Sequence, residues 1–235
     1  MNALNRNRSN YYPLEGGIDL QSIMRQVYTW MVLGMLVTAG VAYVISTNPS
    51  LINLAANPII LLVAILAEFG VVLVISRGLS RLSSSTAMLL FILYAALNGF
   101  TLSLVLLAFS SGSVFLAFAT TAALFGVMSV IGYTTRVDLS KLGAYLMMAI
   151  LGLIIAMVIN LFVNSGLLDM LISMAGVLIF TGLTAFDTQR IGRMAAEMSM
   201  NGEAAVKFGI FGALKLYLDF INMFLFVLRL TGRRR

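Results

Sequence analysis

Seven long apolar runs constrain the fold of this chain more than any other feature of its sequence. They lie at residues 27–46, 59–76, 86–109, 113–133, 142–163, 167–187 and 208–230. A helix needs about 20 apolar residues to cross the hydrocarbon core of a bilayer, and each run is that long or nearly so. Because a backbone in lipid must satisfy its own hydrogen bonds, the runs predict an all-α membrane protein with seven transmembrane helices.

The composition supports this prediction and removes several classes of chemistry. The chain is 60% hydrophobic and 10% charged, with a mean hydropathy of +1.00, whereas soluble domains carry roughly 25% charged residues. The absence of cysteine excludes disulfides, thiol catalysis and iron–sulfur clusters. The absence of histidine removes the usual zinc ligands, the serine and cysteine triads and the side chain that normally titrates near neutral pH. We therefore expect neither an enzyme nor a bound cofactor.

The sequence divides into three segments. Residues 1–24 are polar and lack the short apolar core and the cleavage site of a signal peptide, so we interpret them as an N-terminal tail. Residues 25–232 form the predicted seven-helix transmembrane domain, and residues 233–235 form a basic C-terminal tail.

Basic residues alternate between the connections and predict the orientation of the bundle. They occur before the first run, after the second and fourth runs, and between the sixth and seventh runs; the connections after the first, third and fifth runs contain none. The positive-inside rule then predicts a cytoplasmic N-terminus. We interpret the net charge of +6 as this topological pattern and expect no nucleic-acid partner.

The end of the chain conflicts with that pattern. Seven full crossings would place Arg233, Arg234 and Arg235 outside the cell. Either the last helix re-enters on the cytoplasmic side, or the earlier helices set the orientation of the bundle despite these three late charges.

Among the charged side chains in the apolar runs we single out four: Glu68, Asp187, Lys215 and Asp219. A charge inside a bilayer costs several kcal/mol, so such groups face protein or water and are candidates for function. Lys215, Asp219 and Asn222 share one face of the last helix, and Asp219 lies about 16 Å from either end of its run. The alternative for Asp219 is a structural ion pair with Lys215, one turn away. Asp187 is predicted to end the sixth helix.

Two stripes of small or amide side chains are predicted to pack helices together, as such residues do in membranes. One comprises Tyr94, Asn98 and Thr101, and the other comprises Gly152, Ala156 and Asn160.

The two late aspartates lie in extended motifs. These are Gly182-Leu-Thr-Ala-Phe-Asp187-Thr-Gln-Arg-Ile191 and Leu216-Tyr-Leu-Asp219-Phe-Ile-Asn222-Met-Phe-Leu225, followed by Leu228-Arg229. Supporting segments are Gln26-Val-Tyr28, Glu68 and Gly132-Tyr-Thr-Thr-Arg-Val-Asp138-Leu-Ser140. Over roughly residues 20 to 232 the chain resembles the Bax inhibitor-1 family, also called the transmembrane Bax-inhibitor-motif family, and in particular its bacterial inner-membrane members.

The resemblance implies a fold in which the seventh helix is surrounded by the other six. It also implies a calcium leak across the bacterial cytoplasmic membrane, with Asp187 and Asp219 as the pH sensor, gate and transient calcium site. Candidate modulators are Glu68, Lys215 and an arginine near the end of the second helix, which corresponds to Arg77 or Arg81. Lys215 departs from the small or hydroxylated residue expected there, and a lysine at that position would weaken proton sharing between the carboxylates.

The implied mechanism is physically coherent. Two carboxylates in contact at low dielectric share one proton, because ionising both is costly. Loss of that proton adds repulsion and frees oxygen ligands for a divalent cation. Counting along the runs, however, places Asp187 at the rim and Asp219 at the midplane, about 16 Å apart. They meet only if the last helix is displaced toward the cytoplasm or the sixth helix continues past residue 187.

A proton-gated cation leak channel is our first hypothesis. The alternative is a non-conducting interaction protein that modulates a membrane-bound quality-control protease through the N-terminal tail and the loop at residues 194–207. An intramembrane aspartyl protease also needs two aspartates on adjacent helices. That class is disfavoured because Leu216-Tyr217-Leu218 precedes Asp219 where such proteases have Gly-x-Gly. No substrate motif supports a lipid or metabolite transporter.

Overall fold

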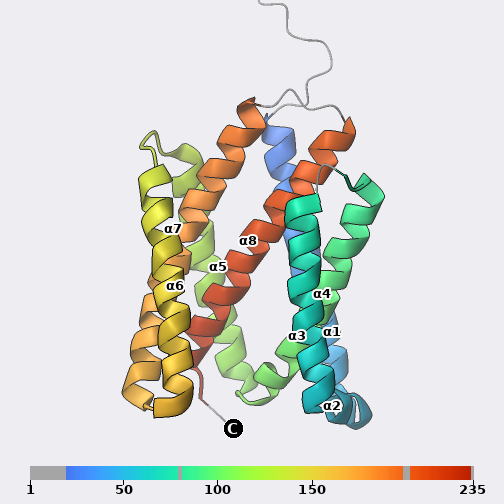
Figure 1. Ribbon diagram of the computed structural model, residues 1–235, viewed down its shortest axis with the longest axis vertical. Helices are drawn as coiled ribbons and strands as arrows, with labels where there is room; N and C mark the ends of the chain where they lie inside the picture. The colour runs from blue at the N-terminus through green and yellow to red at the C-terminus, as the bar shows by residue number, and fades with distance from the viewer. Residues whose placement is uncertain (1–19, 79–80, 198–201, 234–235) are drawn as a thin grey trace, which may run out of the picture.

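The computed structural model describes residues 20–78, 81–197 and 202–233. Its helices in chain order are α1 (Leu20–Thr47), α2 (Pro49–Ala55), α3 (Pro58–Gly78), α4 (Ser84–Leu107), α5 (Ser111–Thr134), α6 (Ser140–Val163), α7 (Gly166–Glu197) and α8 (Gly202–Thr231) (Figure 1). Within the described ranges, all of these except the short α2 are long and apolar enough to cross a membrane, which makes seven. The predicted seven-helix, all-α fold is confirmed.

Helices α1, α7 and α8 extend several residues beyond their predicted apolar runs, and α8 does so by beginning at Gly202. The first, α1, begins at Leu20, because Ile23 and Met24 are buried although they precede the apolar run. The sixth spanning helix, α7, continues to Glu197. Asp187 therefore lies about three turns inside α7, and the prediction that it ends the helix was wrong.

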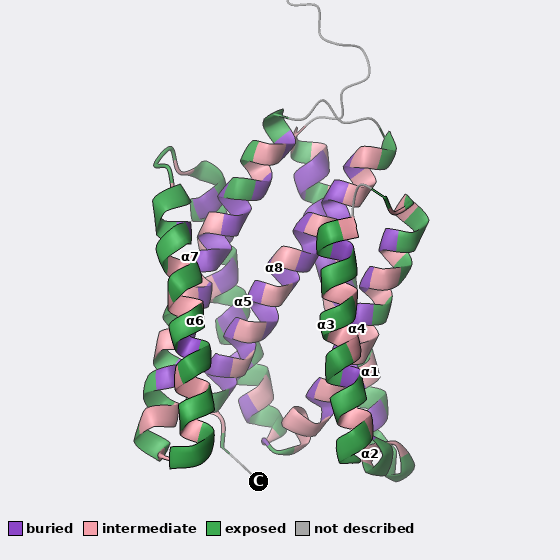
Figure 2. Ribbon diagram, in the orientation of Figure 1, coloured by how far each residue is buried: buried purple, intermediate pink, exposed green. Residues whose placement is uncertain are grey.

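The last helix, α8, is the most buried of the spans. In its 18-residue apolar window 72% of the residues are buried, against 11% in α3 and 6% in α6. Helices α1, α4, α5 and α7 pack directly on α8, while α3 packs on α4 and α6 packs on α7. Figure 2 shows the buried positions along α8 and the exposed outer faces of α3 and α6. The enclosed last helix implied by the family resemblance is therefore present.

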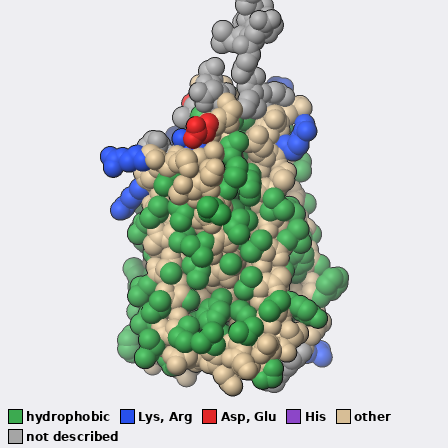
Figure 3. Space-filling view, turned by 90° about the vertical axis from the view of Figure 1, so that its right-hand side faces the viewer, with side chains coloured by type: hydrophobic (Ala, Val, Ile, Leu, Met, Phe, Trp, Pro, Cys, Tyr) green, Lys and Arg blue, Asp and Glu red, His purple; other side chains and the backbone are tan. Residues whose placement is uncertain are grey.

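The outer surface has the chemistry of a lipid-facing bundle. Large apolar side chains are exposed along its sides, including Phe69, Phe115, Phe162 and Leu178. On the face in Figure 3 the hydrophobic side chains cover the flank and most charged side chains gather at one end. Extensive apolar exposure of this kind indicates contact with lipid.

The path of α8 bears on the two alternatives for the C-terminal arginines. The start of α1 and the end of α8 lie at opposite ends of the bundle (Figure 1). Arg233 is held at the α4–α5 connection: its carbonyl accepts from the Ser110 N–H at 3.1 Å, and its own N–H donates to Ser113 Oγ at 2.9 Å. The last helix thus runs the full length of the bundle, which favours a full crossing. Arg234 and Arg235 lie outside the described residues.

Close approaches at two glycines bring the central helices together. A Cβ on Gly99 of α4 would lie 2.6 Å from the Thr38 carbonyl oxygen of α1. A Cβ on Gly132 of α5 would clash with the backbone of Ala185, two residues before Asp187 in α7. Only glycine permits these backbone contacts, which fix α1 against α4 and α5 against α7.

The two predicted packing stripes had different outcomes. Tyr94 and Asn98 are buried, as predicted. Gly152 faces outward with no atom within 4 Å of its ideal Cβ, so its predicted packing role was wrong. The close approach of α6 to α7 is at Gly143, against the Phe186 ring.

Candidate functional site: an acidic cavity beside the central helix

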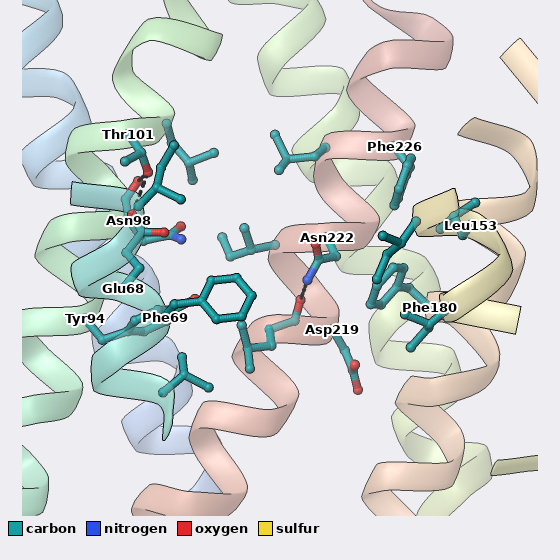
Figure 4. Close-up of a pocket in the computed structure, with 18 of the residues that line it drawn as sticks. Glu68, Phe69, Tyr94, Asn98, Thr101, Leu153, Phe180, Asp219, Asn222 and Phe226 are labelled. Carbon is teal, nitrogen blue, oxygen red and sulfur yellow. Dashed lines mark hydrogen bonds between the residues drawn. The ribbon is translucent and has the colours of Figure 1, made fainter. Parts of the chain in front are cut away.

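A cavity of about 760 Å³ lies beside α8, with α3 and α4 on one side and α6 and α7 on the other. Most of its lining is apolar. The polar lining residues are Glu68, Tyr94, Asn98, Thr101, Asp187, Lys215, Asp219 and Asn222. In Figure 4, Glu68, Asn98 and Thr101 lie on one side of the view, and the carboxyl group of Asp219 on α8 points away from them. The structure thus brings Glu68, Asp187, Lys215 and Asp219 to one cavity.

On the α7–α8 wall, Lys215 pairs with Asp187. The Lys215 ammonium nitrogen lies 3.4 Å from each carboxylate oxygen of Asp187. The Asp187 side chain is 7% exposed and that of Lys215 is 31% exposed. This ion pair joins neighbouring helices. The alternative predicted from the sequence, a pair between Lys215 and Asp219 within one helix, is not formed in the described structure.

Asp219 is the polar group on this wall that lacks a partner. It is 5% exposed, and its Oδ2 atom has no hydrogen-bond partner among the described residues. A buried polar atom left without a partner costs about 1–3 kcal/mol. Asp187 and Asp219 share the cavity, but no hydrogen bond joins their carboxyl groups in the part of the chain that the structure describes. Asp219 is therefore held in a state that favours a proton or another donor.

The α3–α4 wall is built differently. Glu68 Oε1 accepts a hydrogen bond from Thr101 Oγ1 at 2.8 Å. The Tyr217 hydroxyl donates to Asn98 Oδ1 at 3.1 Å and lies 2.6 Å from Thr38 Oγ1. Thr38 also donates to the Ala95 carbonyl oxygen at 2.9 Å. These bonds connect α1, α3, α4 and α8 through buried or partly buried polar groups.

The two candidate arginines do not line the cavity. Arg77 is in the last turn of α3 and Arg81 follows that helix, and both are exposed. Arg77 is nine residues, or about 13 Å, along α3 from Glu68, which explains why it lies outside the cavity. A modulating role for either arginine stays a prediction.

The family model described as "Inhibitor of apoptosis-promoting Bax1" matches residues 20–235. The chain belongs to the Bax inhibitor-1 family. It is 45% identical over 216 residues to an uncharacterized protein of Deinococcus radiodurans, covering 92% of each chain. It is 44% identical over 213 residues to an uncharacterized protein of Borreliella burgdorferi, covering 90% of this chain and 92% of that one. It is 40% identical over 218 residues to the inner membrane protein YbhL of Escherichia coli, covering 92% and 93%.

In this Bax inhibitor-1 family member, the side chain of Gln189 joins the α5–α6 connection to α7 by hydrogen bonds. Gln189 accepts the Leu139 N–H at 2.9 Å and donates to the Val137 carbonyl oxygen at 2.7 Å. Gln189, two residues after Asp187 in the same motif, thus has a structural role, because it anchors the segment that connects α5 and α6.

The same connection carries a strongly ionised aspartate. The side-chain and backbone hydrogen bonds from Ser140, together with one from Arg193 at 2.7 Å, lower the pKa of Asp138 to about 2. Asp138 is exposed at the end of the bundle. It therefore stays ionised throughout the physiological pH range.

Sequence reasoning did not single out Thr38. It lies in α1 with Gly34 and Ala42 at four-residue spacing, and all three are buried. That pattern of small residues is typical of a close helix contact in membranes and would have pointed to this face.

The cavity offers limited ligands for a metal ion. Among the described residues, no group of three or more histidine, cysteine, aspartate or glutamate side chains is placed to hold one. The predicted transient calcium site at Asp187 and Asp219 would have two carboxylates, one of them already paired with Lys215. It stays a prediction.

Proposed function

We propose that this chain is a pH-sensitive cation leak channel of the Bax inhibitor-1 type in a bacterial inner membrane, with Asp187 and Asp219 as its gate and calcium as a permeant ion. The observation that carries the proposal is the buried, unpartnered Asp219 carboxyl in a cavity that also contains Asp187 and Lys215. The inner-membrane name of YbhL supports the location.

The charge arrangement supports a proton-dependent gate. With a proton on Asp219, the α7–α8 wall carries one carboxylate and one ammonium group, which neutralise each other. Loss of that proton leaves two carboxylates and one ammonium group in a site where both aspartates are buried. The excess negative charge is stabilised by a cation or by a change in helix packing.

Lys215 modifies this mechanism in this chain. Its ammonium group neutralises Asp187, so the proton is held at Asp219 instead of being shared directly between two carboxylates. Removing the lysine charge therefore changes the pH at which the gate responds.

The elements that move are α3 or α6. Both have little buried surface and flank the cavity, whereas α1, α4, α5 and α7 pack closely on α8. Displacing a sparsely packed helix disrupts the fewest apolar contacts, so opening along α3 or α6 requires the least free energy.

Calcium flux into proteoliposomes between pH 5 and pH 8 tests the proposal. The intact chain is compared with Asp187→Asn and Asp219→Asn, with Asp169→Asn as a control for an aspartate in α7 that does not line this cavity. We expect the pH midpoint to move or vanish in the first two variants and to persist in the control.

Folding of each variant is checked by size-exclusion profile and thermal unfolding. Absence of flux at every pH, or flux indifferent to both cavity substitutions, overturns the proposal. That result would favour the non-conducting interaction protein that modulates a membrane-bound protease. Its expected contact segments at residues 1–24 and 194–207 lie partly outside the described residues.

A further inference from the structure

The acidic cavity extends to the lipid-facing surface of the bundle. Its lining includes Ile65 and Phe69 of α3 and Met147 and Ile154 of α6, which are 42%, 70%, 55% and 46% exposed. These side chains belong to the two helices with the least burial. A molecule dissolved in the bilayer therefore meets the cavity from the side, between α3 and α6.

The cavity has the size and lining of a small-molecule site. Its volume of about 760 Å³ lies within the ~300–1,000 Å³ typical of ligand pockets, which are largely apolar with a few convergent polar groups. Here the apolar part comes from leucine, isoleucine, methionine and phenylalanine side chains, and the polar groups lie on the two opposed walls (Figure 4).

The polar groups favour a cation. Three carboxyl groups line the cavity, from Glu68, Asp187 and Asp219, against one ammonium group, that of Lys215. Lys215 is committed to Asp187, and Glu68 accepts a bond from Thr101. The buried Asp219 Oδ2 atom still lacks a donor within the described structure.

We propose that this cavity binds a membrane-dissolved amphiphile with a protonated amine head and a single apolar chain. The ammonium group donates to the Asp219 carboxyl group, in the same cavity that Glu68 lines. The chain lies among the apolar side chains and leaves toward the lipid between α3 and α6. This inference goes beyond the proposed leak, because it requires binding and no ion flux.

The head-group charge is the property that the site selects. An alcohol of equal chain length fills the apolar part but supplies no charge to the carboxyl groups, and a fatty acid adds a repelling one. A hydrogen bond between charged groups is worth about 1.5–3 kcal/mol, which corresponds to an affinity difference of about tenfold or more.

Binding is measured on the purified full chain in a non-ionic detergent by native mass spectrometry, with decylamine, decan-1-ol and decanoate as probes at pH 7. We expect decylamine to bind at least about tenfold more tightly than the other two. Asp219→Asn should reduce this preference to within about threefold, whereas Asp169→Asn, whose aspartate lies outside the cavity, should retain it.

Equal binding of the amine and the alcohol to the intact chain overturns the proposal, as does an amine preference that Asp219→Asn leaves intact. Glu68→Gln is measured in the same way and should lower the preference by a smaller factor. If Asp219→Asn does not yield folded protein, Glu68→Gln decides: an unchanged preference then overturns the proposal. Because no flux is measured, failure here is distinct from failure of the leak channel.

Discussion

The two walls of the cavity contain similar numbers of polar groups but satisfy them differently. On the α3–α4 wall, Glu68, Thr101 and Asn98 all take part in hydrogen bonds, Asn98 with the Tyr217 hydroxyl of α8. On the α7–α8 wall, one ion pair lies beside a carboxyl group that has an unpartnered oxygen. Satisfied buried polar groups specify packing, whereas a partly satisfied group responds to protons and ligands. The first wall is therefore structural, and the second is where function is expected.

Residues of α8 bond with groups on both walls. Tyr217 lies between Lys215 and Asp219 in the sequence, and each is two residues, or about 200°, from it around α8. The tyrosine consequently points toward α1 and α4 while the charged pair points toward α7. The position of Tyr217 is thus coupled to the orientation of the charged face.

The largest effect should come from removing the cation on the α7–α8 wall. Lys215→Met leaves Asp187 buried without its partner and should lower the free energy of unfolding by about 3 kcal/mol at pH 7. That is the low end for a buried pair, because Lys215 is 31% exposed. Thermal and denaturant unfolding in detergent measure the loss.

The double variant Lys215→Met with Asp187→Asn isolates the ion pair. It should recover most of the lost stability, because no uncompensated charge remains. As a matched lysine control, Lys207→Met removes a contact to the exposed Glu203 and a bond to the Leu82 carbonyl, and should cost about 1 kcal/mol or less. If the double variant is no more stable than Lys215→Met alone, the ion pair is not the cause.

A smaller effect is expected on the satisfied wall. Tyr217→Phe removes the hydroxyl that bonds Asn98 and Thr38, and should lower the free energy of unfolding by about 1–2 kcal/mol at every pH between 5 and 8. Tyr94→Phe is the control: Tyr94 is also buried, but its hydroxyl makes no hydrogen bond within the described residues. That variant should stay within about 0.5 kcal/mol. Equal losses in the two variants would contradict the structural role of the Tyr217 network.

Thr101→Val probes the same wall at Glu68. Valine keeps the shape of the side chain but cannot donate to the Glu68 carboxyl, which is 2.8 Å away in the structure. We expect a loss of about 1 kcal/mol, together with a steeper dependence of stability on pH, because Glu68 then resembles the unpartnered Asp219. Denaturant unfolding at pH 5, 6.5 and 8 measures both. An unchanged pH profile would show that the Thr101 bond does not hold Glu68 in its present state.

Hydropathy predicted the spans, because they follow from local composition. The enclosed position of the last helix and the grouping of Asp187 with Asp219 came from the family resemblance, since counting along the spans placed the two aspartates far apart. The extension of α7 was missed because Thr188, Gln189 and Arg190 interrupt the apolar run, although Ile191 and Ala195 beyond them are buried. The outward position of Gly152 was missed for another reason. Lipid is as apolar as a protein interior, so apolar periodicity does not reveal which face of a membrane helix packs inward.

The sequence alone could not predict which carboxylate pairs with Lys215. Asp219 lies at the favourable i+4 spacing, and nothing local shows that the side chain reaches across to Asp187 instead. That choice depends on the crossing of α7 and α8, which is set by contacts such as Gly212 against Ile191 and Gly176 against Phe226. Tertiary packing, not helix spacing, decides which carboxyl group is neutralised.

The smallest effect should come from the one aspartate outside the membrane whose titration the structure defines. Asp138, with its pKa lowered to about 2, contributes stability that is present above the unfolded value of about 3.9 and is lost as the pH falls through about 2. Between pH 5 and pH 8 that contribution is constant. Asp138→Asn should therefore leave the shape of both the stability profile and the calcium-flux profile unchanged across this range. A shift in either midpoint would place part of the pH response at the α5–α6 connection, and would weaken the assignment of the response to the wall that holds Asp219.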